Sequence, residues 1–213
     1  MNSDQILSHF KETDALLAGH FILSSGLHSG KYLQCALALQ YPADAGKFGH
    51  AIADHFVISS SPAGGGVATA SADGVVGGER PPLSIDTVAS PAIGGLVIGF
   101  AVAQALNVRF IWTERQEGLM TLRRGFSIIE GERILVVEDV ITTGGSTREC
   151  IEALEKHGGE VVGAASIIDR SNGKADVGVP RIALVSLDVA TYQPDACPLC
   201  AAGSVAYKPG SRK

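Results

Sequence analysis

Residues 133–147, with the sequence RILVVEDVITTGGST, place the strongest constraint on how this chain folds. The apolar, β-branched run 134–137 is typical of a parallel strand that is covered on both faces. Two acids follow at the carboxyl end of this strand, and a glycine-containing turn comes next. Ser146 and Glu149 have the S-x-x-E spacing of a capping box, so we predict that a helix begins at Ser146.

This strand–turn–helix unit is suited to binding a phosphorylated sugar. The free N–H groups of a helix N-terminus, together with the positive end of the helix dipole, bind phosphate. Glu138 and Asp139 stand beside the turn and offer two carboxylates for sugar hydroxyl groups. The alternative is an ordinary strand-to-helix turn whose acids face solvent. The segment therefore predicts a phosphate cradle beside two acids.

The segment also resembles the motif that binds PRPP (5-phosphoribosyl 1-pyrophosphate) in type I phosphoribosyltransferases. In that family an apolar strand is followed by two acids, an apolar pair and T-T-G-G-S/T. The resemblance implies that the acids contact the ribose 2- and 3-hydroxyls and that the loop holds the 5-phosphate. The PRPP-binding residues it implies in this segment are Glu138, Asp139, Val140, Ile141, Thr142, Thr143, Gly144, Gly145 and Ser146.

Strands and helices alternate after residue 83, which indicates an α/β fold with a doubly wound, mainly parallel sheet and right-handed crossovers. Ligands bind such sheets outside the carboxyl ends of the strands. We therefore expect four loops to converge on one site, at residues 89–95, 113–125, 138–146 and 169–174.

The length of 213 residues suits one α/β domain with additions, here a single phosphoribosyltransferase domain over residues 1–213. An amphipathic helix from Ser3 to about Leu17 and a strand–turn–strand pattern after it predict a small N-terminal hood. The expected order is hood elements over 1–42, a flexible Gly/Ala/Ser-rich loop over 59–82, the PRPP-binding core over 83–190 and a tail over 191–213.

Further segments resemble those of one subfamily, the orotate phosphoribosyltransferases. Residues 21–32 look like the motif that wraps the orotate ring, residues 90–95 like the pyrophosphate loop, and residues 114–126 stand in the place of the catalytic flexible loop. Arg170 looks like the arginine that pairs with the orotate carboxylate, and a salt bridge to Asp169 is the alternative. The orotate-binding residues implied are Ser25, Gly26, Thr142 and Arg170, with Lys31 and His28 as further candidates.

The resemblance implies transfer of the ribose 5-phosphate of PRPP to orotate, giving orotidine 5′-phosphate and pyrophosphate in pyrimidine (UMP) biosynthesis. C1 of the ribose becomes oxocarbenium-like as pyrophosphate leaves, so the site must align the reactants and neutralise the leaving charge. Mg²⁺ carried by PRPP supplies part of that neutralisation, and we assign it no protein ligand. The catalytic residues we expect are Arg115, which also binds PRPP, Arg123, Arg124 and Asp139, since a planar guanidinium binds phosphate oxygens bidentately.

The chain departs from the subfamily pattern in its loops. Ser24 and Gly94 stand where many members have lysine. The flexible loop of the subfamily commonly reads R-K-x-x-K-x-H, and after its arginine this chain has Gln116, Leu119 and Thr121 at the other places. We therefore expect a divergent branch in which Arg123 and Arg124 replace the missing charge. The alternative for these two arginines is a solvated hairpin face.

The cysteines are Cys35, Cys150, Cys197 and Cys200, a set that fits a reducing cytoplasm better than a disulfide framework. Cys197 and Cys200 have zinc-knuckle spacing, but the chain has no second C-x-x-C. A structural metal would need two more ligands from distant parts of the fold. We expect instead two reduced cysteines in a surface tail, and a core thiol at Cys150.

Bulk properties narrow the class of protein. The net charge of −5 gives no general indication of nucleic-acid binding. No apolar run approaches the roughly 20 residues of a membrane span. The first residues lack the features of a secretory signal. We expect a cytoplasmic homodimer that binds orotate and PRPP. The alternatives are a phosphoribosyltransferase for another base, against which Arg170 argues, and a non-catalytic PRPP-sensing regulator, for which no basic nucleic-acid-binding element is visible.

Overall fold

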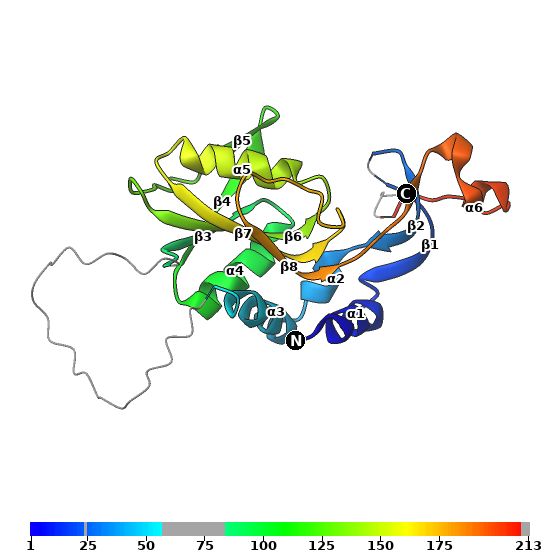
Figure 1. The fold of residues 1–213 in the computed structure, drawn as a ribbon, viewed down its shortest axis with the longest axis horizontal. Helices are drawn as coiled ribbons and strands as arrows, with labels where there is room; N and C mark the ends of the chain where they lie inside the picture. Colours follow the sequence, from blue (N-terminus) through cyan, green and yellow to red (C-terminus); the bar gives the residue numbers. More distant parts are fainter. Residues whose placement is uncertain (24, 57–83, 210–213) are drawn as a thin grey trace, which may run out of the picture.

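The computed structural model describes residues 1–23, 25–56 and 84–209 (Figure 1). The loop expected over 59–82 lies outside the described residues, and so does Ser24. The elements before that loop are α1 (Ser3–Glu12), β1 (Leu16–Ile22), β2 (His28–Leu33), α2 (Cys35–Leu39) and α3 (Pro42–Ala53). The first helix ends earlier than predicted, because Leu16 already belongs to a strand.

The elements after the loop alternate as predicted. They are β3 (Thr87–Pro91), α4 (Gly95–Leu106), β4 (Arg109–Gln116), β5 (Leu119–Leu122), β6 (Arg133–Ile141), α5 (Gly145–Glu155), β7 (Glu160–Asp169) and β8 (Arg181–Ser186). The C-terminal segment adds β9 (Thr191–Tyr192), the 3-10 helix η1 (Pro194–Ala196) and α6 (Pro198–Ala201).

The main sheet has six strands in the order β5-β4-β3-β6-β7-β8. Its β4, β3, β6, β7 and β8 run parallel, and only β5 pairs antiparallel, as the second strand of a hairpin with β4. In Figure 1, α5 lies on one face of this sheet and α3 and α4 lie on the other. The predicted α/β class with a mainly parallel sheet is therefore confirmed.

The centre of the sheet follows from the sequence of β6. Residues 134–137 are completely buried, as a strand covered on both faces must be. Leu135 and Val137 pack with α1 to α4, whereas Ile134 and Val136 pack with α5, because successive side chains of a strand point to opposite faces. This strand delivers the two acids to the carboxyl edge of the sheet.

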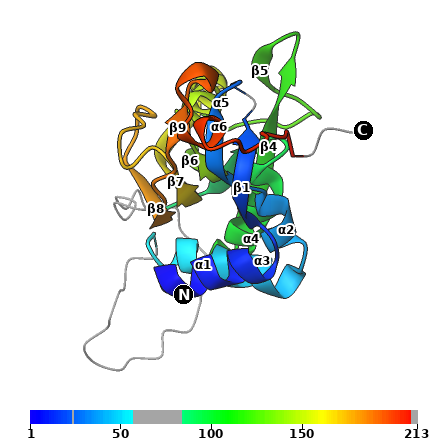
Figure 2. The same ribbon diagram turned by 90° about the vertical axis from the view of Figure 1, so that its right-hand side faces the viewer.

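The hood is a second, antiparallel sheet in the order β1-β2-β9. Its third strand comes from the C-terminal segment, which the sequence did not indicate. The segment also follows β1 beyond β9, since Ile22 N donates to Tyr207 O at 2.8 Å and Tyr207 N donates to His20 O at 3.1 Å. Figure 2 shows α6 close to β1, while β9 pairs with β2. The two ends of the described chain thus build one hood over the main sheet.

In the described part of the chain, no helix combines the length and the apolar character that crossing a bilayer requires.

Candidate active site

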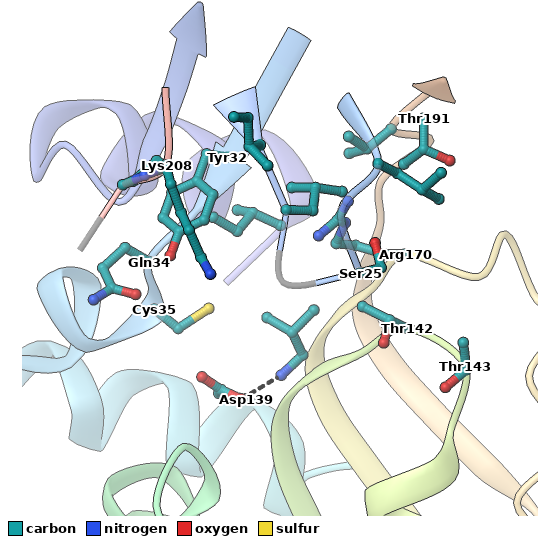
Figure 3. Close-up of a pocket in the computed structure, with 17 residues that line it drawn as sticks. Ser25, Tyr32, Gln34, Cys35, Asp139, Thr142, Thr143, Arg170, Thr191 and Lys208 are labelled. Atoms are coloured by element: carbon teal, nitrogen blue, oxygen red, sulfur yellow. Dashed lines mark hydrogen bonds between the residues drawn. The ribbon is translucent and has the colours of Figure 1, made fainter. Parts of the chain in front are cut away.

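Two cavities meet at the carboxyl end of β6. The larger, of about 580 Å³, lies between the hood and the main sheet, and the smaller, of about 270 Å³, lies around the loop that leads into α5. Asp139, Val140, Thr142 and Thr143 line both. Figure 3 shows the larger cavity with Asp139 at its base. A ligand with two parts could therefore occupy both cavities at once, with its middle against Asp139.

The smaller cavity lies at the N-terminus of α5. Gly144 is the N-cap residue, with a φ of 80°, and a Cβ there would lie 2.9 Å from Val177 Cγ1, so the turn requires glycine. No side chain caps the helix, apart from a long contact of 3.4 Å from Gly145 N to Thr143 Oγ1. The first N–H groups therefore face the cavity and suit an anion.

The predicted capping box is wrong. The helix begins at Gly145, and Ser146 lies within its first turn. Glu149 turns outward to form an ion pair with Arg115, whose Nη2 lies 2.5 Å from Glu149 Oε2. A left-handed glycine in place of a serine cap leaves the helix terminus open, which favours ligand binding over self-capping.

The two acids differ in their environment. Glu138 is buried, and burial together with the adjacent Asp139 raises its pKa to about 9, so it is neutral at pH 7. Asp139 accepts a hydrogen bond from Val140 N at 2.8 Å, which fixes its carboxylate between the two cavities. One acid thus offers a hydroxyl donor as well as an acceptor, and the other offers a charge.

The loop after β3 closes the smaller cavity. Pro91, Ala92 and Gly94 line it, and the peptide bond between Ala92 and Ile93 is cis. A Cβ at Gly94 would lie 2.8 Å from Asp139 Oδ1. The glycine that stands in place of the subfamily lysine therefore lets this loop approach the acid directly.

We predict that Glu138 makes folding stability dependent on pH. Its folded-state pKa of about 9 lies above the ordinary value of 4.5, so its contribution to stability is complete below about pH 4.5 and is lost as pH rises toward 9. The free energy of unfolding of Glu138→Gln, which cannot ionise, is expected to decline less over this range than that of the unmodified chain. Urea titrations at several pH values measure this difference. Glu155→Gln, at an exposed position on α5, is the matched control, and parallel profiles for Glu138→Gln and the unmodified chain would contradict the prediction.

Arg170 projects into the larger cavity from the loop after β7 (Figure 3). Its Nε atom is buried and has no hydrogen-bond partner among the described residues. Burial lowers the pKa of the guanidinium, which stays charged at neutral pH. A buried donor without a partner is uncommon in folded proteins, so the Nε of Arg170 is available to a ligand in the cavity. A carboxylate is the group that a guanidinium binds best.

The alternative for Arg170, a salt bridge to Asp169, is wrong. Asp169 is buried and pairs with Arg181, whose Nη1 lies 3.1 Å from Asp169 Oδ2. It also accepts hydrogen bonds from Ser171 N at 2.7 Å and Gly173 N at 2.9 Å. Asp169 therefore holds the shape of the loop and leaves Arg170 to the cavity.

The hood lines the other side of the larger cavity. Ser25 lines it, whereas Gly26, with a φ of 82°, forms the adjoining turn through a hydrogen bond from its N–H to Leu23 O. Lys31 is exposed and lines neither cavity. His28 is buried and also lines neither.

Several lining residues were missed by the sequence analysis. Cys35 is buried beside Asp139, and burial together with that carboxylate raises the pKa of its thiol. Lys208 reaches the cavity from the C-terminal segment (Figure 3). The remaining missed polar residues are Tyr32, Gln34 and Thr191. No local pattern could reveal Lys208 or Thr191, because only the pairing of the C-terminal segment with the hood brings them here.

The three loop arginines lie away from both cavities. Arg115 donates to Gly118 O at 2.9 Å and pairs with Glu149. Arg124 pairs with Glu114, with its Nε 2.6 Å from Oε1, and Arg123 Nη1 lies 3.4 Å from Oε2 of the same acid. These cations, led by Arg124, hold the pKa of Glu114 down at about 2. In this conformation the arginines form part of the β4–β5 hairpin.

Comparison with known proteins gives relatives over the whole chain. A model of the phosphoribosyl transferase domain matches residues 79–182. The orotate phosphoribosyltransferases of Caldicellulosiruptor bescii and Pelotomaculum thermopropionicum are each 47% identical over 213 residues, which covers 100% of this chain and of each relative. That of Rhizorhabdus wittichii is 43% identical over 212 residues, which covers 100% of this chain and 97% of the relative.

Solved structures share the fold. Orotate phosphoribosyltransferase from Aeropyrum pernix superposes with a TM-score of 0.63 at 22% identity, over 85% of this chain and 93% of that one. Adenine phosphoribosyltransferase from Thermoanaerobacter pseudethanolicus gives 0.52 at 18% identity, over 74% and 88%. At these identities the structures show the fold alone, and the choice between bases depends on the sequence relatives and on the cavity itself.

Proposed function

The chain belongs to the orotate phosphoribosyltransferase family, and from this premise we propose that it transfers the ribose 5-phosphate of PRPP to orotate in pyrimidine biosynthesis. The products are orotidine 5′-phosphate and pyrophosphate. The observation that carries the choice of acceptor is the buried, unpartnered Nε of Arg170 in a cavity that adjoins a phosphate cradle. A neutral purine base has no carboxylate for this group.

PRPP takes the smaller cavity in this proposal. Its 5-phosphate binds the N–H groups at the start of α5, where the one side-chain contact among the described residues is the long one from Gly145 N to Thr143 Oγ1. Asp139 and the neutral Glu138 bind the ribose hydroxyls, which holds C1 at the junction of the two cavities. The loop residues proposed to hold PRPP with these acids are Val140, Ile141, Thr142, Thr143, Gly144, Gly145 and Ser146.

Orotate takes the larger cavity, with its carboxylate on Arg170. Ser25 and Thr142 supply hydrogen bonds from two sides, and the turn at Gly26 positions Ser25. Because Arg170 and Asp139 line the same cavity, orotate and the ribose lie next to each other. Fixing both reactants in this way removes much of the entropy cost of the reaction.

Charge neutralisation completes the mechanism. Mg²⁺ that arrives with PRPP would neutralise part of the charge on the leaving pyrophosphate. Asp139 is a hard oxygen donor that would suit such an ion, whereas Glu138 is protonated at neutral pH and would suit it less. Arg115, Arg123 and Arg124 supply further positive charge when the hairpin reaches an active site.

We predict that the double variant Arg123→Ala, Arg124→Ala lowers kcat by about a hundredfold or more. Binding of ribose 5-phosphate is expected to stay unchanged, because its cradle at α5 lies apart from the hairpin. Steady-state kinetics and calorimetric titration with ribose 5-phosphate measure the two effects. Lys156→Ala, an exposed cation just after α5, is the control. Full activity in the double variant would exclude the proposed replacement of charge.

We propose that the chain forms a homodimer in which the hairpin serves the partner's site. The β4–β5 hairpin projects from the main sheet in both views (Figures 1 and 2), and its arginines lie outside the cavities of their own subunit. Exposed Ile93, Val97 and Phe100 supply an apolar surface for association. Mixing the Arg123→Ala, Arg124→Ala double variant with Arg170→Ala should restore activity, because one site of a hybrid dimer then has every group intact. A mixture no more active than its components would contradict shared sites.

The proposal extends to domain organisation and location. Both sheets line the larger cavity, which supports one phosphoribosyltransferase domain over residues 1–213. The four cysteines are free, which supports a cytoplasmic location.

The function is tested by pyrophosphate release from PRPP with orotate, uracil or hypoxanthine as the acceptor. Orotate alone is expected to support rapid release. Faster release with hypoxanthine or uracil would overturn the choice of acceptor. PRPP binding without release for any base would favour the non-catalytic regulator.

A further inference from the structure

Four metal-binding side chains from distant parts of the chain converge in the hood. His20 belongs to β1 and His28 belongs to β2. Cys197 is the N-cap residue of α6, and Cys200 lies within that helix. One potential ligand atom from each lies within 4.8 Å of all the others. Figures 1 and 2 show α6 beside β1, which agrees with this contact. The C-x-x-C pair thus meets the two distant ligands that a tetrahedral metal site would require.

The distances fit tetrahedral zinc. With Zn–S bonds of about 2.3 Å and Zn–N bonds of about 2.0 Å, ligand atoms lie roughly 3.3–3.8 Å apart around a tetrahedral ion. His20 Nε2 lies 3.0 Å from His28 Nδ1, 3.5 Å from Cys197 Sγ and 3.8 Å from Cys200 Sγ. Cys200 Sγ lies 3.3 Å from His28 Nδ1. The four atoms already enclose a space of the size of the ion.

The outer contacts of His20 favour the form that binds metal. Its Nδ1 lies 3.0 Å from Ser204 O, and a carbonyl can only accept, so this nitrogen carries the proton. Nε2 is then left with a lone pair that points at the cluster. Metal-binding histidines typically donate their second ring N–H to a backbone carbonyl or carboxylate in this way.

Burial distinguishes the cluster from a chance meeting of surface residues. His20, His28 and Cys197 are 4%, 8% and 3% exposed. The expectation of two surface thiols is therefore wrong for Cys197. Cys200 is exposed, which gives an ion a route from solvent to the buried ligands.

We propose that His20, His28, Cys197 and Cys200 bind one structural Zn²⁺ ion. All four tetrahedral positions are filled by protein, which is the arrangement of structural rather than catalytic zinc. The ion ties the C-terminal segment to the hood, a few residues before Tyr207 pairs with β1 and Lys208 reaches the larger cavity. Zinc binding thus holds in place one wall of the cavity.

The competing explanation is a metal-free cluster in which one histidine donates to the other and both thiols stay protonated. It would satisfy the same groups by hydrogen bonds. The two explanations differ in metal content and in the number of thiolates, so both can be measured without any assay of activity.

The first experiment uses the unmodified, untagged chain, purified under reducing conditions without chelator. Elemental analysis is expected to find about one zinc per chain. Replacement by Co²⁺ should give the intense visible bands of a tetrahedral site and a thiolate-to-cobalt charge-transfer band in the near ultraviolet. A reduced chain that binds neither Zn²⁺ nor Co²⁺, or that gives only the weak spectrum of octahedral cobalt, would overturn the proposal.

Variants test the ligands. Cys200→Ser is expected to halve the charge-transfer intensity, and the double variant Cys197→Ser, Cys200→Ser to lose both zinc and the band. Cys150→Ala and His50→Gln, which lie outside the cluster, should retain zinc fully. A chelator should lower the melting temperature of the unmodified chain and leave that of the double variant unchanged. Equal loss of zinc in the control variants would assign the metal to another site. Every measurement here is of metal content, spectrum or stability, so the result does not depend on which base is the substrate.

Discussion

Arg170→Ala is expected to lower kcat/KM for orotate by about a hundredfold or more. Removing one partner of a buried, hydrogen-bonded charge pair costs about 2–5 kcal/mol, and about 2.7 kcal/mol corresponds to a hundredfold. The loss should fall on orotate, because Arg170 lines the larger cavity and lies outside the phosphate cradle. Steady-state kinetics with each substrate varied in turn will separate the two effects.

The controls for this variant are chosen for charge and shape. Arg170→Lys keeps the charge but loses the planar fork, so it should recover only part of the activity. Arg148→Ala removes an exposed arginine that lines neither cavity and should behave like the unmodified chain. An Arg170→Ala variant with an unchanged KM for orotate would remove the main support for orotate as the acceptor.

Asp139→Asn is expected to lower kcat/KM for PRPP by about thirtyfold. A hydrogen bond to a charged group contributes about 1.5–3 kcal/mol, and 2 kcal/mol corresponds to roughly thirtyfold. The substitution keeps the shape of the side chain, whose carboxylate lies at the junction of the two cavities. The variant should also make stability less dependent on pH, because the charge of Asp139 contributes to the raised pKa of Glu138.

This second effect separates a local change from a loss of fold. Asp54→Asn, the exposed C-cap position of α3, is the matched control and should change neither kinetics nor pH dependence. If Asp139→Asn kept full kcat/KM for PRPP while its stability profile flattened, Asp139 would act only on Glu138 and would have no contact with the ribose.

The parts of the fold that were predicted correctly depend on local pattern. Residues 134–137 could be assigned to a buried strand because their β-branched side chains have no polar face. The helix α4 ends at Leu106 because its C-cap residue Asn107 adopts the left-handed conformation that asparagine tolerates. The order of strand, turn and helix over residues 133–155 could be predicted because the three follow each other directly in the sequence.

The errors arise where a side chain has a choice of partner. Glu149 has the spacing to cap α5 but pairs with Arg115, which the fold brings to it from the hairpin. Asp169 stands next to Arg170 in the sequence but pairs with Arg181, a residue twelve positions away. The spacing of residues along a helix determines which local side-chain pairs are possible. Residues that the fold brings close from elsewhere in the chain determine which partner each side chain actually contacts.

The four ligands of the proposed metal site could not be connected from the sequence, because their contacts span the greatest separations. His20 and Cys197 are 177 positions apart, and no periodic pattern connects them. Two histidines in a hairpin and one C-x-x-C are each weak signals of metal binding. Their meaning depends on the pairing of the C-terminal segment with β1 and β2, which only the three-dimensional structure reveals.

The hood combines strands from both ends of the chain, and this limits the order in which a newly synthesised chain can fold. The strands β1 and β2 leave the ribosome first, but β2 obtains its second neighbour only after residues 191–192 have been synthesised. The main sheet, whose last strand ends at Ser186, can therefore be complete while the hood is still open. The cavity around the N-terminus of α5 can therefore form before the hood closes the larger cavity, which is completed last because Thr191 and Lys208 line it.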